Sequence, residues 1–395
     1  MKKILVLNCG SSSIKYRLFD SMFSQILVGL VEKIGENGTR LVHTKGAETL
    51  EEKANVRGHK DAIALMLRML HDRKWGAVKD IKEISVVGHR VVHGGGMRKP
   101  SLLSGKTVRY LKQFELLAPL HNPHNITGIT EARKAMPGVP QVMVFDTEFH
   151  QTMPEKAYLY GLPYEFFEKY AVRRYGFHGI SHKYVSERAA IMLGKRKPNV
   201  ITCHLGAGSS ITAVKGGISI DTSMGMTPLE GVMMSTRTGD LDPAIMQYLV
   251  KRYGFKYDGL LDIMNNRSGL LGLSEASKDM RDIQDGIRKG NRGCRRAMDV
   301  FCYRVAKYIG SYFAALGMVD AIVFTGGIGE NSAQARGEIC SYLANMGAKI
   351  DRRKNAVRSG REREISETGS RTKILVIPTN EALMIAKEAA SVVER

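Results

Sequence analysis

Short apolar runs alternate along the chain with longer segments that have the apolar spacing of helices. The first twenty residues read as a hairpin, and further strands are predicted at 84–87, 141–145, 199–205, 211–214, 218–221, 321–324 and 374–378. Helices are predicted at 107–118, 180–193 and 382–392, within a mostly helical stretch at 242–316, and residues 352–371 are expected to form an exposed, charged connection. This alternation without low complexity predicts an α/β protein.

The same kind of turn follows two of the predicted strands. The first copy reads Asn8-Cys9-Gly10-Ser11-Ser12-Ser13-Ile14-Lys15, and the second reads His204-Leu205-Gly206-Ala207-Gly208-Ser209-Ser210. Small residues let backbone N–H groups converge on one anion, and serine hydroxyls add donors. One copy could be a plain hairpin. Two copies about half the chain apart predict a duplicated domain with two phosphate-binding turns that face each other.

Composition and length narrow the class of protein. The chain has 395 residues, enough for two domains, with a boundary expected near 151–154. No apolar run approaches the ~20 residues that span a bilayer, and the first residues lack the apolar stretch of a signal peptide, so a cytoplasmic location is expected. Five scattered cysteines, an odd number without a CxxC pair, argue against disulfides.

The net charge of +20 is high. No nucleic-acid recognition motif and no interleaving of aromatic with basic residues accompanies it. We therefore attribute the charge to solubility and to attraction of anionic, phosphorylated substrates rather than to nucleic-acid binding.

Polar residues stand where several apolar strands run into glycine or proline turns: Asn8, Arg90, His121, Asp146, His178, Arg237 and Glu381. Ligands of α/β proteins bind at such strand ends. Each residue alone has a structural alternative, such as an internal hydrogen bond, a surface ion pair or a helix cap. Together with three glycine turns they favour phosphoryl transfer, which needs guanidinium and imidazole donors and carboxylates that hold Mg²⁺. The P-loop and the protein-kinase signatures are absent from the sequence.

The ordered motifs from residue 4 to residue 386 resemble those of acetate kinases. They are the first turn at 8–15, His89-Arg90-Val91-Val92-His93-Gly94-Gly95, Phe145-Asp146-Thr147, Phe149-His150-Gln151-Thr152-Met153-Pro154, Arg174-Tyr175-Gly176-Phe177-His178-Gly179, Thr227-Pro228-Leu229-Glu230-Gly231, Thr236-Arg237 with Gly239-Asp240, Gly326-Gly327-Ile328-Gly329-Glu330-Asn331 and Thr379-Asn380-Glu381.

The resemblance implies two ribonuclease-H-like domains around a nucleotide cleft, the fold of sugar kinases, Hsp70 and actin. It assigns 1–150 plus 383–395 to the acyl and phosphoryl side, and 151–382 to nucleotide binding and dimerisation. The implied reaction is ATP + acetate ⇌ ADP + acetyl phosphate, by direct in-line transfer with Mg²⁺ or Mn²⁺. A homodimer and a place in acetyl-CoA biosynthesis are implied as well.

The resemblance also implies roles for individual residues. The catalytic set is Arg90, His121, Asp146, His178 and Arg237, with Asn8 and Glu381 placing the metal. Arg90, Val92, Leu120, Phe177 and Pro228 would bind the acyl group, and Val92 would favour acetate without excluding propionate. The nucleotide would be bound by Ser11, Ser12, Ser13, Lys15, His204, Leu205, Gly206, Ala207, Gly208, Gly326, Gly327, Ile328, Gly329 and Asn331.

Five positions depart from the family pattern. Ala207 replaces a usual asparagine and Ser235 a usual glycine, while Glu148, Ile180 and His124 replace other residues. If Glu148 continued the preceding strand, it would share a face with Asp146. Four alternatives stay open. They are a kinase of propionate or another short acyl group, a kinase with another phosphoryl donor such as pyrophosphate, a kinase-dead relative, and an actin- or Hsp70-like ATP-binding module. The intact glycine motif argues for a nucleotide, and the two arginines with the acyl pocket argue against a switch module.

Overall fold

The computed structural model describes residues 2–36, 38–119 and 121–394, and it divides into two compact units. The N-terminal unit comprises residues 1–148 and 380–395, and the C-terminal unit comprises 149–379. All five cysteines are free and buried.

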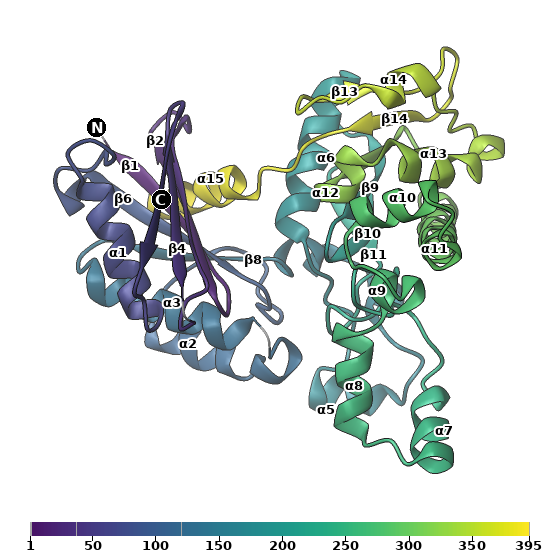
Figure 1. Ribbon diagram of the computed structural model, residues 1–395, viewed down its shortest axis with the longest axis horizontal. Coiled ribbons are helices and arrows are strands. Elements are labelled where there is room, and N and C mark those ends of the chain that lie inside the picture. Colours follow the sequence, from purple (N-terminus) through teal and green to yellow (C-terminus); the bar gives the residue numbers. More distant parts are fainter. Residues whose placement is uncertain (1, 37, 120, 395) are drawn as a thin grey trace. The chain divides into compact units, whose positions relative to one another are not determined.

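The N-terminal unit is built on one mixed sheet (Figure 1). Its strands are β1 (Lys3–Cys9), β2 (Ser13–Asp20), β3 (Gln25–Glu32), β4 (Thr39–Lys45), β5 (Glu48–Ala54), β6 (Ile84–Val91), β7 (Ser101–Leu102) and β8 (Gln141–Phe145). They lie in the order β5-β4-β3-β2-β1-β6-β8-β7. β1 to β5 form an antiparallel meander, and β6 and β8 run parallel to β1.

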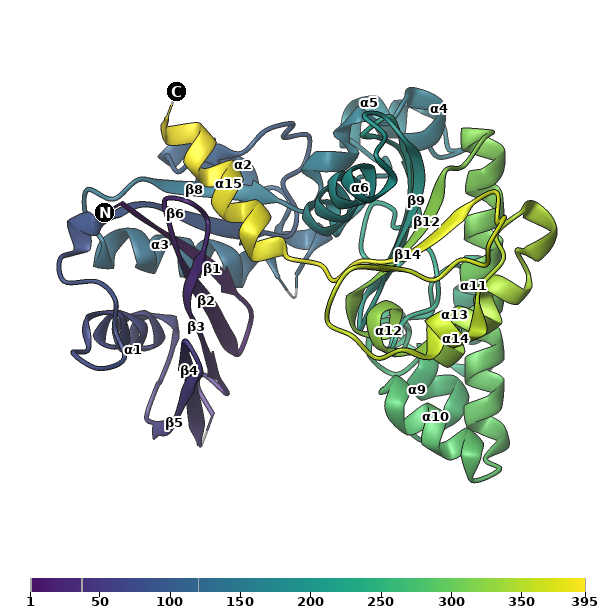
Figure 2. The same ribbon diagram turned by 90° about the horizontal axis from the view of Figure 1, so that it is seen from above.

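Helices cover both faces of this sheet. They are α1 (His59–His71), α2 (Gly105–Lys112), α3 (Asn122–Ala135) and α15 (Glu381–Val393). Val87 belongs to the core that β1 shares with α1, whereas Gly88, its neighbour, faces α15. A Cβ at Gly88 would lie 2.8 Å from the Ile385 side chain, so glycine lets α15 lie across the strands (Figure 2).

The C-terminal unit repeats this sheet pattern. Its strands are β9 (Asn199–Leu205), β10 (Ser209–Lys215), β11 (Ile218–Thr222), β12 (Ala321–Thr325), β13 (Arg363–Glu364) and β14 (Lys373–Val376). The order β11-β10-β9-β12-β14 matches β3-β2-β1-β6-β8, with the same two antiparallel and two parallel pairings. The two small-residue turns join β1 to β2 and β9 to β10. The predicted duplication is therefore confirmed.

The helices of the C-terminal unit enclose its sheet from both sides. They are α4 (Glu155–Tyr158), α5 (Tyr164–Tyr170), α6 (Gly179–Leu193), α7 (Ala244–Tyr253), α8 (Tyr257–Asn266), α9 (Gly269–Ser274), α10 (Met280–Arg288), α11 (Arg292–Leu316), α12 (Gly326–Asn331), α13 (Ala333–Ser341) and α14 (Arg352–Ala356). Val200 packs against α6, whereas the next residue, Ile201, packs with Phe301 of α11. Strand alternation thus builds two cores.

Several local predictions are wrong. Residues 25–54 form three strands that the sequence analysis did not predict, and α3 follows a helix that ends at Lys112 rather than 118. Residues 326–331 are helical rather than a glycine turn, and 352–371 contain α14, β13 and the buried Ile365. The three strands at 25–54 arise from pairing with their neighbours along the chain, and the other differences arise from packing within each unit.

Candidate active site

Three predicted site residues meet at the carboxyl edge of the N-terminal sheet. β6 extends to Val91, so Arg90 lies within the strand rather than after it. Leu7 of β1 pairs with His89 of β6, which places Asn8 and Arg90 at matching positions. Asp146 follows β8, and its N–H donates to the Val91 carbonyl at 3.0 Å. The parallel register therefore gathers an amide, a guanidinium and a carboxylate.

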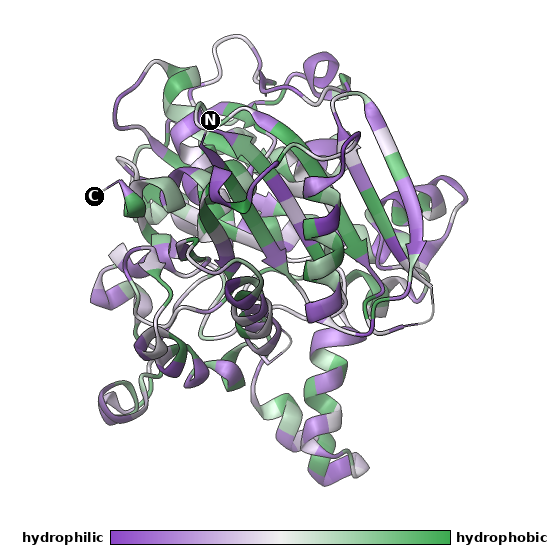
Figure 3. Cartoon of the chain, turned by 90° about the vertical axis from the view of Figure 1, so that its left-hand side faces the viewer, coloured by the Kyte–Doolittle hydropathy of each residue, from purple (hydrophilic) through white to green (hydrophobic). Residues whose placement is uncertain are grey.

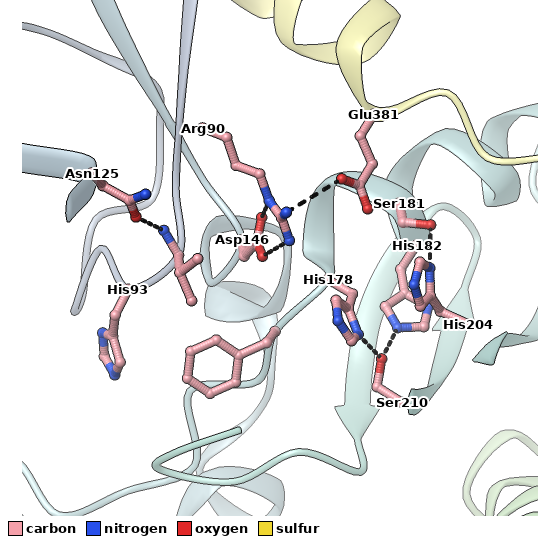
Figure 4. A network of polar contacts seen from close by, with 12 residues as sticks. Arg90, His93, Asn125, Asp146, His178, Ser181, His182, His204, Ser210 and Glu381 are labelled. Atoms are coloured by element: carbon pink, nitrogen blue, oxygen red, sulfur yellow. Dashed lines mark hydrogen bonds and ion pairs between the residues drawn. The ribbon is translucent and has the colours of Figure 1, made fainter. Parts of the chain in front are cut away.

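Arg90 is held between two carboxylates (Figure 4). Its Nε donates to Asp146 Oδ1 at 3.0 Å and its Nη2 to Oδ2 at 2.7 Å, while Nη1 lies 3.8 Å from Glu381 Oε2. The Arg90 side chain is 19% exposed and that of Asp146 is 2% exposed. Burial acts to lower the pKa of Arg90, but the charges of Asp146 and Glu381 outweigh it and raise that pKa. Arg90 is permanently cationic.

Arg17 on β2 completes this group, although the sequence analysis did not single it out. Its Nη1 donates to Asn380 Oδ1 at 3.3 Å, and Asn380 caps α15 by accepting from the Leu383 N–H at 3.1 Å. Burial lowers the pKa of Arg17, and the charge of Glu381 opposes this shift. The strand pattern gave no signal for Arg17, because its role depends on a helix more than 360 residues away.

The first turn is closed by a hydrogen bond from the Gly10 N–H to the Ser13 carbonyl at 2.8 Å. Ser11 and Lys15 are exposed, and Ser12 and Ser13 are half-buried. His59 Nε2 donates to the Gly10 carbonyl at 2.7 Å. The backbone of the first turn, which would bind an anion, is thus held in place by His59.

The remaining predicted residues of this unit lie near α3. His121 immediately precedes the helix, and the buried Val92 donates its N–H to Asn125 Oδ1 at 3.1 Å. Leu120 lies outside the described residues.

Glu148 begins a short 3₁₀ segment at Glu148–Thr152, so it does not continue the strand and does not share a strand face with Asp146. The predicted acyl pocket stays a prediction, since Phe177 and Pro228 belong to the C-terminal unit.

A histidine network stands at the corresponding edge of the C-terminal sheet. His178 has a left-handed backbone (φ 56°) and precedes α6. Its Nδ1 lies 2.8 Å from Ser210 Oγ, which is also 2.7 Å from His182 Nε2 (Figure 4). His178 stacks on His204 with ring centroids 4.3 Å apart, and His204 Nδ1 is bound to Ser181 Oγ at 2.8 Å. These contacts fix the plane of His178.

Burial and the neighbouring histidines set the protonation of this network. Burial first, and then the charges of His150 and His204, lower the pKa of His182 well below its usual value. Burial also lowers the pKa of His150 to about 4. These two internal histidines are therefore neutral at physiological pH.

A pocket of about 1080 Å³ opens within the C-terminal unit. The second turn lines it through Gly206, Ala207 and Gly208, together with Arg237 and residues Gly327, Ile328 and Asn331 of α12. A Cβ at Gly208 would lie 3.2 Å from His178 Nε2 and 3.5 Å from Arg237 Nη1, so both side chains flank this turn.

Other predicted nucleotide residues shape the pocket without lining it. His204 belongs to the histidine network, Leu205 is in the core, and Gly329 packs against β9. Gly326 has φ +77°, and a Cβ there would lie 2.7 Å from the Leu205 carbonyl oxygen, so glycine is needed for α12 to start beside β9.

Charges in the pocket favour an anion beside Arg237 and the second turn. Arg237 forms no ion pair with the residues that the structure describes, and its Nη1 donates to the Pro228 carbonyl at 3.3 Å. Burial lowers the pKa of Arg237, which nevertheless stays far above neutrality. The sequence analysis missed other lining residues, among them Lys278, Asp279, Met280, Arg281, Gln284 and Arg288 around α10, Glu330 in α12, and Arg336, Asn355, Arg358 and Arg363 near α14.

The repeated sheet and the anion-binding groups at its strand ends define a protein of the duplicated ribonuclease-H-like class. A profile of the acetokinase family matches residues 3–387. The acetate kinase of Thermotoga maritima is 51% identical over 400 aligned residues, covering 100% of this chain and 99% of that protein. The chain belongs to the acetokinase family.

Solved structures agree over the whole length. The crystal structure of Porphyromonas gingivalis acetate kinase matches with a TM-score of 0.93 and 43% identity over 100% of both chains. That of a propionate kinase from Francisella tularensis matches with a TM-score of 0.93 and 42% identity, covering 99% of this chain and 100% of the other.

Proposed function

We propose that this chain is an acetate kinase, which transfers the γ-phosphoryl group of ATP reversibly to acetate. The observation that carries the proposal is the C-terminal pocket, where a small-residue turn, an arginine that pairs with no carboxylate of the described residues, and the start of α12 line one space. The acetate kinases among its relatives support this choice of reaction.

The chemistry needs positive charge and positioning rather than a general base. A carboxylate oxygen of acetate attacks the γ-phosphorus, and the bond from that phosphorus to the oxygen of ADP breaks. Acetate is already ionised at neutral pH, so no proton has to be removed. Arg237 and His178, which flank Gly208, would donate to the phosphoryl oxygens, and Arg90 would neutralise the acyl carboxylate.

The carboxylates beside Arg90 suit a magnesium ion. No group of three His, Cys, Asp or Glu side chains forms a closed metal site among residues 2–36, 38–119 and 121–394. Mg²⁺ commonly takes only one or two carboxylates and keeps waters and phosphate oxygens as ligands. Asp146 and Glu381, with Asn8 at the same strand edge, offer hard oxygen donors of this kind. When bound, the ion would neutralise charge on the nucleotide phosphates.

Propionate is the second candidate substrate. The matched Francisella tularensis structure is that of a propionate kinase, so the fold and most of the sequence suit either acid. A single methylene is worth only about 1–3 kcal/mol in a hydrophobic pocket. The acyl preference thus depends on a few side chains, of which Val92 is the one that the sequence analysis identified.

We also propose a homodimer in which α7 and α8 take part. α7 buries none of its residues, although its sequence is AIMQYLVKRY. Tyr248 is 57% exposed, Tyr253 is 61% exposed, and Phe255 and Tyr257 follow with similar exposure. In Figure 3 these lowest helices carry hydrophobic segments between polar ones. A second copy would cover this apolar surface.

Within the part of the chain that the structure describes, every helix is too short or too polar to span a bilayer. A cytoplasmic location stays a prediction from the sequence.

A hydroxamate assay tests the proposed reaction. Acetate, propionate and butyrate are each supplied with ATP, GTP or pyrophosphate, and the acyl phosphate is trapped with hydroxylamine. We expect the largest kcat/KM with acetate and ATP. Turnover only with pyrophosphate, or no acyl phosphate with any pair, would overturn the proposal.

A further inference from the structure

Ser235 is fixed beside the second phosphate turn by its backbone. Its N–H donates to the Ala207 carbonyl at 3.2 Å, and its own carbonyl accepts from the Leu271 N–H at 3.0 Å. The residue is thereby held between the turn and α9. Two residues further along the chain, Arg237 lines the same pocket.

The Ser235 hydroxyl has no hydrogen-bond partner among the described residues, although the residue is only 8% exposed. Ser235 lines the pocket next to Ala207 and Gly208. Its oxygen is not one of the fully buried side-chain atoms that lack a partner, so it is open to the pocket, where a ligand can accept a hydrogen bond from it. Ala207, on the turn itself, presents only a methyl group. A side-chain donor is therefore available on the wall of the pocket at Ser235 and not on the turn at position 207.

We propose that the Ser235 hydroxyl donates a hydrogen bond to a phosphate oxygen of the nucleotide. The inference rests on the proposed function, since it takes the pocket as a nucleotide site. The hydroxyl would act beside Arg237, which supplies charge, and beside the backbone N–H groups of Ala207 and Gly208, since that of Gly206 donates to the Gly208 carbonyl. A neutral donor to a charged acceptor typically changes affinity by about tenfold to a hundredfold.

A steric role makes the opposite prediction. If the Ser235 side chain only narrowed the pocket near Arg237, removing it would relieve crowding and tighten nucleotide binding. Ser235→Ala removes the oxygen and keeps Cβ, whereas Ser235→Gly removes both atoms. The two variants therefore separate hydrogen bonding from bulk.

The experiment is calorimetric binding of ADP and of adenosine to the full-length protein and its variants. We expect Ser235→Ala and Ser235→Gly each to weaken ADP binding by at least about tenfold, with adenosine binding unchanged because adenosine has no phosphate. Ser311→Ala removes an exposed hydroxyl on α11 of the same unit and should leave both affinities unchanged. Ala207→Asn in the Ser235→Ala background should restore most of the ADP affinity by adding a donor to the exposed position 207.

Several results would overturn the inference. They are unchanged ADP affinity in Ser235→Ala, tighter ADP binding in Ser235→Gly, an equal loss for adenosine, or no ADP binding by the unaltered protein. A failure of the proposed reaction would give a different experimental result from a failure of the Ser235 assignment. If the hydroxamate assay fails while ADP binding still depends on the hydroxyl, the phosphotransfer proposal falls and the assignment of Ser235 stands.

Discussion

The Nδ1 atom of His178 and the Oγ atom of Ser210 lie 2.8 Å apart, and the same hydroxyl lies 2.7 Å from Nε2 of His182. Ser210 belongs to β10, immediately after the second small-residue turn. The strand that follows the phosphate turn therefore also orients the imidazole, and only the opposite nitrogen of His178, beside Gly208, is directed toward that turn. One hairpin thus sets both the backbone of the second turn and the direction of the imidazole.

We expect Ser210→Ala to lower kcat by about tenfold to a hundredfold, because His178 loses the hydrogen bond that orients it. Steady-state kinetics with acetate and ATP measure this, and circular dichroism checks the fold. The double variant with His178→Gln should be scarcely slower than His178→Gln alone, since the two residues act as one unit. Independent, additive losses would contradict this coupling.

Replacing either Arg90 or Arg237 by alanine should lower kcat by at least about a hundredfold while the protein stays folded. Both guanidiniums supply charge that a neutral side chain cannot replace. The matched control is Arg40→Ala, which removes an exposed arginine paired with Glu32 and Glu51 on the sheet surface and should have little effect. Near-normal turnover in either site variant would remove that arginine from the reaction.

Val92→Ala should raise kcat/KM for propionate relative to acetate by about tenfold, because the smaller side chain makes room for one methylene. The measurement is the ratio of the two kcat/KM values. Val108→Ala, in α2, makes the same truncation at a residue outside the proposed acyl pocket and is the control. An unchanged ratio would show that Val92 does not contact the acyl group.

The stability of the N-terminal unit should fall as the pH falls from about 6.5 to about 4. Burial lowers the pKa of His89 from 6.5 to about 4, and its Nε2 is bound to Gln141 Oε1 at 2.7 Å. Between these two pH values the unfolded chain binds a proton at this histidine that the folded chain does not bind. The free energy of unfolding therefore falls by up to about 3 kcal/mol as the pH falls. Above pH 6.5 this contribution to stability is fully present.

Trp75 is the single tryptophan and belongs to the same unit, so its fluorescence reports the unfolding that His89 affects. The urea midpoint should be lower at pH 5 than at pH 7.5, and His89→Gln should reduce the difference. A midpoint that does not change with pH would contradict the assignment.

Tyr248→Asp combined with Tyr253→Asp should convert a dimer into monomers, because two charges would be buried in an apolar interface. Light scattering after size exclusion measures the mass. Met22→Asp places a charge at an exposed apolar residue of the N-terminal unit and should leave the mass unchanged. A dimer that survives the double substitution would place its interface elsewhere.

Local patterns predicted the elements that carry the chemistry. The strands at 141–145 and 199–205 were predicted with the bounds that the structure shows, because both are buried apolar runs bounded by turn residues. β4 and β5 were missed because most of their side chains are polar and their strand character comes from pairing with neighbours. β3 was missed although its sequence, QILVGLVE, is apolar between its two end residues. α12 was mistaken for a turn because glycines make helix and turn difficult to distinguish in sequence.

The sequence by itself determined the repeat, the family and the chemical groups at the strand ends, since these depend on residue identity and on order along the chain. Only the tertiary structure decided that Arg17 contacts Asn380, that Ser210 connects His178 with His182, and that Ser235 is bound to the Ala207 carbonyl on the wall of the pocket. Such relationships join segments that are far apart in sequence. They arise from sheet register and helix packing, which spacing along one strand or helix does not encode.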